Sequence, residues 1–260
     1  MPEGPEVYIT AKRFEKHFLN KNILSITSNT KTKVDVPFES KLIKSYSYGK
    51  VIILKTEGYY IHIHLGISGW FVFEKPRIYK YILNFSNKSI YLQDRRRFSS
   101  IKIFMNKEEH DKDISILGVD ILTKKFTHDY FYKNIAKSKK NICSFIMNQK
   151  MFAGIGNYIK NDALYLSKIS PYRKTNNLTK NEIRLLFKNI LFVSFSNLTD
   201  WHKSYKVKIS NEILELTPEY IESPYNFYIF DREVDNYGNK VELDKKHCGR
   251  RTYFVKKIQK

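Results

Sequence analysis

The chain opens with a proline behind the initiator methionine and with two carboxylates close by, in Met1-Pro2-Glu3-Gly4-Pro5-Glu6. The small Pro2 normally permits removal of Met1, which would leave a secondary amine at the new N-terminus. An α-amino group has a pKa of about 8, so an appreciable fraction is unprotonated at neutral pH. Such an amine can attack a carbonyl-like carbon and form an iminium ion, with Glu3 and Glu6 as general acid or base. The same residues are typical of a first helical turn, and taken alone they favour that structural interpretation.

Further segments combine glycines or cations in patterns suited to phosphates or bases. They are Tyr48-Gly49-Lys50, His64-Leu65-Gly66-Ile67-Ser68-Gly69, Asp94-Arg95-Arg96-Arg97-Phe98 and Gly154-Ile155-Gly156-Asn157-Tyr158. Lys50 could hold a phosphate, although an exposed lysine at a strand end is the default explanation. Three consecutive arginines beside Phe98 are hard to explain as core and indicate a functional loop. Glycines ahead of a helix let backbone N–H groups approach an anion, but they also let two helices pack closely.

The charge balance indicates a polyanionic partner. Lys and Arg number 46 against 26 Asp and Glu, a net charge of +20, which favours nucleic acid over an acidic membrane surface. A solvated lysine-rich face is the alternative, since the chain is rich in Lys, Asn and Ile. No stretch approaches the roughly 18 apolar residues of a membrane span, and the acidic start lacks the basic end of a signal peptide. We therefore expect an intracellular protein, in the cytoplasm or nucleus, that is not secreted and has no membrane partner.

Two kinds of structure must position these residues. Apolar residues with helical spacing predict an amphipathic helix over residues 4–18. Short strands then follow, separated by turns of glycine, asparagine and lysine. They are expected at Val51–Leu54, Tyr59–Leu65, Trp70–Phe73, Tyr79–Phe85, Ser89–Leu92 and Ile101–Phe104. Many short strands predict a sandwich or barrel, and isoleucines alternating with His62 and His64 predict a sheet with one buried face.

After Leu117-Gly118 the pattern becomes helical. Helices are expected at residues 127–137, 140–151, Asn157–Leu166 and Thr179–Ser196. Near the end, Phe227–Phe230 and Thr252–Val255 have the pattern of strands around the turn Asn236–Asn239, which predicts a terminal β-hairpin. The predicted fold class is therefore α+β, with an N-terminal helix and a two-sheet β-sandwich. The predicted domains are a sandwich at 1–118, a linker region at 119–134, a helical domain at 135–225 and the hairpin at 226–260.

In their order along the chain, these motifs resemble the formamidopyrimidine-DNA glycosylase/endonuclease VIII family. A further motif, Gly249-Arg250-Arg251-Thr252-Tyr253-Phe254 with Gln259 beyond, matches the C-terminal finger of that family. The resemblance implies a catalytic β-sandwich domain, a helix–two-turn–helix DNA-binding domain and a finger. It also implies a base-excision repair enzyme, a DNA glycosylase with abasic-site lyase activity. Such an enzyme turns the damaged base out of the helix, because the reacting carbon is inaccessible in a stacked duplex.

The resemblance assigns catalytic roles near the N-terminus. Pro2 would be the nucleophile at C1′ of the deoxyribose, giving a Schiff base that proceeds through β,δ-elimination. Glu3 would protonate the opening sugar, and Glu6 matches a second acid that positions the ring. Lys50 matches a lysine near the reacting sugar, where a cation can hold the adjacent phosphate.

The resemblance also assigns side chains that fill the gap left by the flipped base. The family's gap-filling side chains are matched here by Ile67, Arg96 and Phe98. Unstacking a base step costs a few kcal/mol, which apolar or planar side chains offset. Ordinary core packing is the alternative for Ile67 and Phe98. Ser99 replaces the glycine that is usual in the family, so the path of this loop is an open question.

Contacts to DNA phosphates are expected in three places. The residues concerned are Gly154, Gly156 and Asn157 in the glycine turn, Arg96 and Arg97 in the arginine loop and Arg250 in the finger. Arg250 would contact phosphates beside the lesion through its planar fork, with the adjacent Arg251 as the alternative. Asp162 falls where the family usually carries glutamate and is expected to have a structural or positioning role.

The finger departs from the common family pattern. Most relatives hold this hairpin together with a four-cysteine zinc site, since so small a hairpin is marginal alone. Here Val255 and Ile258 replace the second cysteine pair, and Cys248 has only His247 beside it. The other cysteine, Cys143, is distant in the sequence, so neither a disulfide framework nor a closed four-ligand zinc site is expected. We therefore predict no metal, no cofactor and an apolar finger, as in the zincless endonuclease VIII-like branch of vertebrates and giant viruses.

The sequence thus predicts a bifunctional glycosylase that acts as a monomer on damaged single- or double-stranded DNA. Gly4, where formamidopyrimidine enzymes more often carry leucine, and the zincless finger favour the endonuclease VIII side, which prefers oxidised pyrimidines. One alternative is a formamidopyrimidine/8-oxoguanine glycosylase of the same family. The other is a non-catalytic nucleic-acid-binding module.

Overall fold

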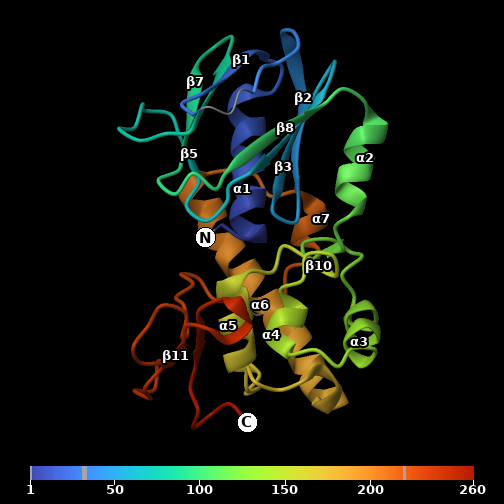
Figure 1. The fold of residues 1–260 in the computed structure, drawn as a ribbon, viewed down its shortest axis with the longest axis vertical. Coiled ribbons are helices and arrows are strands. Elements are labelled where there is room, and N and C mark those ends of the chain that lie inside the picture. The colour runs from blue at the N-terminus through green and yellow to red at the C-terminus, as the bar shows by residue number, and fades with distance from the viewer. Residues whose placement is uncertain (1, 31–33, 219–220) are drawn as a thin grey trace. The chain divides into compact units, whose positions relative to one another are not determined.

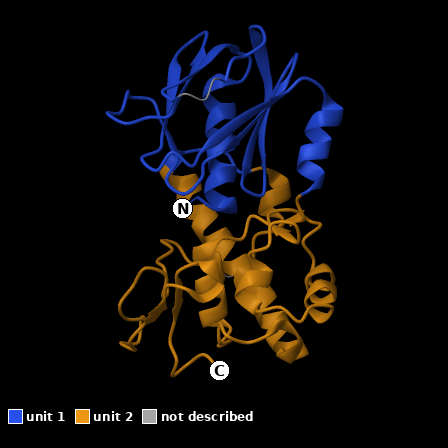
Figure 2. Cartoon of the chain, viewed as in Figure 1, with its two compact units in different colours: residues 1–116, 205–209 blue, residues 117–204, 210–260 orange. Residues whose placement is uncertain are grey.

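The computed structural model describes residues 2–30, 34–218 and 221–260. The chain forms two compact units, unit 1 from residues 1–116 and 205–209 and unit 2 from residues 117–204 and 210–260 (Figure 2). Unit 1 combines helices with a large sheet, whereas unit 2 is mainly helical and ends in a small hairpin (Figure 1). This confirms the predicted α+β class. Within the described residues, no helix combines the length and apolar character needed to cross a membrane.

Helix α1 (Gly4–Phe18) lies in the core of unit 1 and has the predicted bounds. The apolar stripe that predicted it is buried against the sheet. Phe18 stacks on Phe85 with ring centroids 3.9 Å apart, and the Ser45 hydroxyl donates to the Ala11 carbonyl at 2.8 Å. The helix is thereby fixed on the sheet, and its first turn occupies a defined position.

The sheet of unit 1 folds into two layers. Among the described residues its strands are hydrogen-bonded in the order β5-β7-β6-β1-β2-β3-β4-β8, with only a short pairing between β1 and β2. The bounds are β1 (Asn22–Ser28), β2 (Ser40–Tyr48), β3 (Val51–Thr56), β4 (Tyr60–His64), β5 (Trp70–Val72), β6 (Tyr81–Phe85), β7 (Ser89–Gln93) and β8 (Ser100–Phe104). The predicted sandwich is therefore confirmed. Strands β1 and β2 were not predicted, because polar residues interrupt their apolar alternation.

Helix α2 (Lys107–Ser115) was also not predicted, because its sole buried side chain is His110. It covers His62 of β4, which is completely buried, so the prediction that this sheet has only one buried face is wrong. His62 Nδ1 donates to Asp113 at 2.9 Å, and His62 Nε2 accepts from His110 Nδ1 at 2.7 Å. His110 Nε2 in turn accepts from the Tyr46 hydroxyl at 3.1 Å. Both imidazoles are neutral at pH 7, since burial lowers the pKa of each below its ordinary value.

The stability of the protein should fall between about pH 6.5 and pH 4 because of His62. Burial lowers the pKa of His62 from 6.5 to about 4, although its hydrogen bond to Asp113 opposes the shift. In the unfolded chain the imidazole takes up its proton near its ordinary pKa. The unfolded state therefore binds more protons within this window and gains stability as the pH falls. At roughly 1.4 kcal/mol per pKa unit, the loss of folding free energy reaches roughly 3 kcal/mol.

Urea unfolding measured at several pH values between about 7 and 4.5 checks this expectation. The variant His62→Gln should have a flatter dependence of unfolding free energy on pH than the parent. His202→Gln, on helix α6 (Lys180–Tyr205), serves as the matched control and should keep the parental dependence. If His62→Gln and the parent lost stability in parallel, the effect would not come from His62.

Most helices of the described residues lie in unit 2. They are α3 (His128–Ala136), α4 (Ile142–Ile146), α5 (Asn157–Leu166), α6 and α7 (Asn211–Leu214), with short 3-10 turns η1 (Thr175–Asn177) and η2 (His247–Gly249). Helix α5 has the predicted bounds, whereas α4 ends well before residue 151 and α6 continues past Ser196. Residues 119–134, expected to be a linker, include β9 (Val119–Asp120), which pairs in parallel with β10 (Phe152–Ala153).

The terminal hairpin consists of β11 (Glu242–Asp244) and β12 (Thr252–Phe254) in antiparallel pairing. The predicted first strand, Phe227–Phe230, does not form. Three of its backbone N–H groups instead donate to the carboxylate of Asp162 on α5, at 3.0 to 3.1 Å. The predicted turn at Gly238 does form: the Gly238 N–H donates to the Asp235 carbonyl at 3.2 Å, and the Asp235 carboxylate accepts the N–H groups of Tyr237 and Asn239. An isolated bridge, not a pair of strands, flanks it. The hairpin is therefore present, but Phe227–Phe230 is not one of its strands, because its backbone N–H groups donate to the side chain of Asp162 instead of to a neighbouring strand.

Candidate functional site

Glu3 and Glu6 form the N-terminal cap of α1. The Glu6 carboxylate accepts the Glu3 backbone N–H at 2.8 Å, and the Glu3 carboxylate accepts the Glu6 N–H in a reciprocal capping box. Only 1% of the Glu3 surface and 6% of the Glu6 surface is exposed. The helix-start interpretation is thus correct. It also fixes a buried carboxyl group directly beside Pro2, which is the position that a general acid for this amine would need.

Lys50 lies at the end of the sheet where several loops of unit 1 emerge. Gly49 and Lys50 connect β2 to β3, and Gly49 has a φ of 54°, which glycine adopts without strain. The strand register pairs Val51 with His64 and His64 with Ser100. The loop after β4 and the loop before β8 therefore leave from the same end of the sheet as Lys50. In Figure 1 the chain also begins at this end of unit 1.

A buried carboxylate shapes the arginine loop. Asp94 is completely buried and accepts hydrogen bonds from the Ser68 hydroxyl at 2.6 Å and from the N–H groups of Arg96 and Ser99 at 3.2 and 2.7 Å. Burial alone raises the pKa of Asp94, but these hydrogen bonds outweigh it and lower the pKa below its ordinary value. No role was predicted for Asp94, although an acid directly ahead of three arginines could have suggested one.

Lys80 supports the same loop through its backbone. Its buried ammonium group donates to the carbonyl of Arg97 at 2.9 Å and to the carbonyl of Ser99. Ser99 is therefore held through its N–H by Asp94 and through its carbonyl by Lys80. These contacts settle the path of the loop, which the replacement of glycine by Ser99 had left open.

The side chains of this loop point outward. Arg95, Arg96, Arg97 and Phe98 are all exposed, and 57% of the Phe98 surface is accessible. The guanidinium of Arg96 lies 5.2 Å from the centre of the Phe98 ring, a cation–π contact. Core packing is therefore the wrong explanation for Phe98, and Ile67 is itself only partly buried. An exposed ring next to a cation can stack on a nucleic-acid base.

The glycine turn of unit 2 is held by Gln149. Its Oε1 accepts the Gly154 N–H at 3.1 Å, and its Nε2 donates to the carbonyls of Met147 and Ile155, both at 2.8 Å. Gly154 has a φ of 107°, a conformation that side chains rarely adopt. Helix α5 begins immediately after Gly156, so the turn presents a helix N-terminus, where anions are favoured. Sequence reasoning missed Gln149, because a lone glutamine carries no signal.

Asn157 and Lys160 join α5 to the finger within unit 2. Asn157 Nδ2 donates to the backbone carbonyl of Arg251 at 2.9 Å. The buried Lys160 donates to the Thr252 hydroxyl at 3.0 Å and reaches the same Arg251 carbonyl at 3.4 Å. In this structure Asn157, which was predicted as a phosphate ligand, positions strand β12.

Asp162 holds residues 225–230 against α5. Besides the three backbone N–H groups described above, its carboxylate accepts the Tyr225 hydroxyl at 2.6 Å. Burial raises the pKa of Asp162 even though these donors stabilise its charged form. The structural role expected for this residue matches these contacts.

The two finger arginines differ in their surroundings. Arg250 and Arg251 are both exposed. Burial and the hydrogen bond that the Tyr253 hydroxyl donates to Asp231 at 2.9 Å raise the pKa of Tyr253, and the nearby positive charge of Arg251 opposes this rise. Within the described part of the chain, the Arg250 side chain has no hydrogen bond or ion pair. The whole guanidinium group of Arg250 is thus available to contact a ligand.

Apolar packing holds the finger, as predicted. Tyr253 and Val255 are buried in a cluster with Tyr165 of α5 and with two further apolar side chains, and Ile258 packs against it. Val255 and Ile258, which the resemblance places at the second cysteine pair of the family finger, therefore contribute to a small core.

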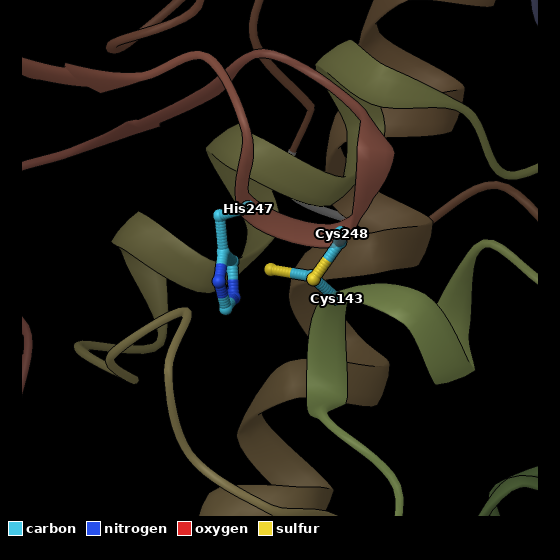
Figure 3. A group of neighbouring side chains, drawn as sticks. All are labelled: Cys143, His247 and Cys248. Atoms are coloured by element: carbon cyan, nitrogen blue, oxygen red, sulfur yellow. The ribbon is translucent and has the colours of Figure 1, made fainter.

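A side-chain cluster that the sequence did not predict lies elsewhere in unit 2. Cys143 of α4 approaches His247 and Cys248 of η2, and their candidate ligand atoms all lie within 4.8 Å of one another (Figure 3). The expectation that Cys248 has only one neighbouring donor is therefore wrong. Residue spacing could not reveal the third donor, because Cys143 reaches the cluster only through the tertiary fold.

Comparisons with known families agree with this geometry. A family model described as the formamidopyrimidine-DNA glycosylase N-terminal domain matches residues 1–101, and one described as the formamidopyrimidine-DNA glycosylase H2TH domain matches residues 117–198. A formamidopyrimidine-DNA glycosylase from Wolbachia sp. subsp. Brugia malayi is 34% identical over 203 residues, which cover 72% of this chain and 74% of the relative. The protein of the same name from Vibrio atlanticus is 32% identical over 203 residues, 73% of this chain and 75% of its own.

Solved structures share the fold over the whole chain. The MutM (Fpg) protein of Thermus thermophilus superposes with a TM-score of 0.79 at 21% identity, covering 99% of this chain and 98% of its own. The Lactococcus lactis Fpg in complex with DNA that contains an oxidised pyrimidine gives 0.79 at 22% identity, with both chains fully covered. At these identities the two structures establish the fold alone.

Proposed function

The chain belongs to the formamidopyrimidine-DNA glycosylase family, and from this membership we propose that it excises oxidised bases from DNA and then nicks the strand. The observation that carries the proposal is the buried Glu3 carboxyl group, fixed beside Pro2 by the capping box. The partner is damaged DNA, bound by a monomer inside the cell. The exposed arginine loop and the glycine turn supply contacts of the kind that DNA phosphates and bases accept.

The proposed chemistry begins at the Pro2 nitrogen once Met1, which lies outside the described residues, has been removed. The nitrogen attacks C1′, the bond between C1′ and the base breaks, and Glu3 delivers a proton to the ring oxygen as the sugar opens. The resulting iminium ion makes a C2′ proton acidic, so that β-elimination breaks the C3′–O bond and δ-elimination then breaks the C5′–O bond. Lys50 holds the neighbouring phosphate, and Glu6 acts by holding the backbone of Glu3.

The proposed lesion class is oxidised pyrimidines, as for zincless endonuclease VIII-like proteins. Gly4 and the apolar finger support this choice. The Lactococcus lactis Fpg whose structure resembles this chain was crystallised with DNA that contains an oxidised pyrimidine. Formamidopyrimidine and 8-oxoguanine lesions are the second candidate, since the curated relatives carry the formamidopyrimidine name.

The decisive experiment offers a panel of defined lesions in single- and double-stranded oligonucleotides and adds borohydride during the reaction. Borohydride reduces an iminium ion to a stable amine, so a covalent protein–DNA adduct that maps to Pro2 is expected. The amount of each base that is excised gives the order of preference among the lesions. Binding without excision, nicking or trapping on any member of the panel would instead indicate a non-catalytic DNA-binding module.

Replacing Arg250 with alanine should weaken lesion-DNA binding and slow excision. A charge-assisted hydrogen bond from a planar fork contributes about 1.5–3 kcal/mol, so we expect a 10- to 100-fold loss at moderate salt. Arg251→Ala is the matched control, because it removes the same charge from the neighbouring exposed position, and it should cost less than about threefold. Equilibrium binding and single-turnover excision measure both variants. A larger loss for Arg251→Ala would transfer the finger role to that residue.

A further inference from the structure

Three side chains with soft or borderline donor atoms converge where η2 meets α4. Cys143 is completely buried, whereas His247 and Cys248 are partly exposed. Figure 3 shows the two sulfur atoms and the imidazole ring facing one another, with Cys143 on α4 and the other two residues on η2. The two sulfurs and one ring nitrogen lie within 4.8 Å of one another. Around one tetrahedral ion, bonds of about 2.3 Å to sulfur and 2.1 Å to nitrogen place ligand atoms roughly 3.6–3.8 Å apart, so the three donors are close enough to share an ion after small side-chain adjustments.

The hydrogen bonds of His247 leave one ring nitrogen suited to a metal. Its Nε2 lies 2.9 Å from the backbone carbonyl of Pro171. A carbonyl oxygen only accepts, so Nε2 carries the hydrogen and Nδ1 keeps its lone pair. Histidines that bind metals commonly donate their second N–H to a carbonyl or carboxylate in this way, which fixes the tautomer and the ring plane. The ring is also packed against Tyr172, with centroids 4.5 Å apart.

The two cysteines are likewise held in place. The Cys143 backbone N–H donates to Asn141 Oδ1 at 2.9 Å, and the Cys248 sulfur lies 2.9 Å from the same oxygen. Cys248 has a φ of 56°, a left-handed conformation that few residues other than glycine adopt. Both donors therefore sit at fixed points of the fold, on segments far apart in the sequence.

We propose that Cys143, Cys248 and His247 bind one thiophilic divalent cation of the Zn²⁺ class, which fastens the finger to α4. Two thiolates and an imidazole select Zn²⁺ over Mg²⁺ or Ca²⁺, which prefer oxygen ligands. Three protein ligands leave a fourth position for water. The site differs from the four-cysteine pattern of the family finger, because one ligand comes from the helical domain and the others precede β12. It also lies directly before Arg250, so the ion would restrain the backbone that carries the finger arginine.

The proposal predicts metal binding by the full-length protein without DNA, independently of its enzymatic activity. Reduced protein stripped with a chelator is titrated with Co²⁺, whose thiolate complexes have charge-transfer bands in the near ultraviolet and ligand-field bands in the visible. We expect both bands to saturate at one equivalent and to disappear when Zn²⁺ is added. Zn²⁺ should also raise the melting temperature of the parent, since the ion binds only the folded chain.

Variants test the identity of the ligands. Cys143→Ser and Cys248→Ser should each abolish the charge-transfer band, and His247→Gln should weaken Co²⁺ binding by at least about 100-fold, beyond the usual effect of an outer-sphere change. His128→Gln on α3 is the matched control and should bind as the parent does. Because Cys143 is buried and its variant could fold poorly, the partly exposed Cys248→Ser and the parental titration suffice to decide.

Several results would overturn the proposal. One is a reduced, folded parent protein that gives no Co²⁺ charge-transfer band. A second is stoichiometric binding that survives loss of both cysteines, which would place the ion elsewhere. A third is protein that is isolated with a Cys143–Cys248 disulfide and that binds no ion after reduction, which would make the pair a redox couple instead.

Discussion

Replacing Pro2 with leucine should abolish both strand nicking and borohydride trapping at abasic sites. A bulky second residue blocks removal of Met1, so no amine would remain at position 2 to attack C1′. Loss of a covalent nucleophile costs on the order of 10³-fold or more in rate. Affinity for lesion DNA should change only a few-fold, because the arginine loop and the glycine turn are untouched. Single-turnover nicking and trapping assays measure the first effect, and equilibrium binding the second.

Pro2→Gly is the matched control for this experiment. Glycine is small enough to permit removal of Met1, and it leaves a primary amine at the same place. Trapping should therefore persist at a reduced rate, and mass spectrometry should confirm the processed N-terminus. If Pro2→Leu trapped DNA as fast as the parent, another amine would have to be the nucleophile.

Replacing Glu3 with glutamine should slow base excision by about 10²- to 10⁴-fold, the usual contribution of a general acid. Glutamine retains an oxygen that can accept the Glu6 N–H, so the capping box and α1 should survive and the loss should be chemical. Cleavage at a preformed abasic site should suffer less, because its sugar already equilibrates with an open aldehyde. Excision and abasic-site cleavage are compared in single-turnover assays.

The variant Glu6→Gln distinguishes the role of the Glu6 carboxylate from that of the Glu3 carboxylate. It retains the acceptor for the Glu3 N–H, and we place Glu6 in a positioning role, so excision should fall less than about tenfold. Equal losses in Glu3→Gln and Glu6→Gln, each with an unchanged melting temperature, would contradict the division of roles between cap and acid.

The sequence predicted those parts of the fold in which local pattern and tertiary environment agree. Helix α1 has its predicted bounds because its apolar stripe faces the core along its whole length. Helix α2 was missed because a helix with one buried side chain leaves no periodic signal. The strand predicted at Phe227–Phe230 failed because Asp162, on a helix far away in the sequence, takes its N–H groups.

The candidate site divides in the same way. Residues that belong to short contiguous motifs, such as Glu3 and Lys50, could be proposed as site residues from the sequence. Their supports could not, because Lys80 and Gln149 act through backbone atoms of other segments. The contact between Cys143 and Cys248 depends on where η2 meets α4, which neither spacing nor composition encodes.

The way in which the arginine loop is held has a consequence for how the protein can diversify. Asp94 and Lys80 hold amide and carbonyl groups of the loop, so the side chains of Arg95, Arg96 and Phe98 do not determine its shape. These three residues can then be exchanged without remodelling the scaffold beneath them, whereas Arg97 is restricted by its φ of 56° and by its hydrogen bond to the Asn29 carbonyl. A new substrate preference could be acquired there by point changes alone, at little cost to stability.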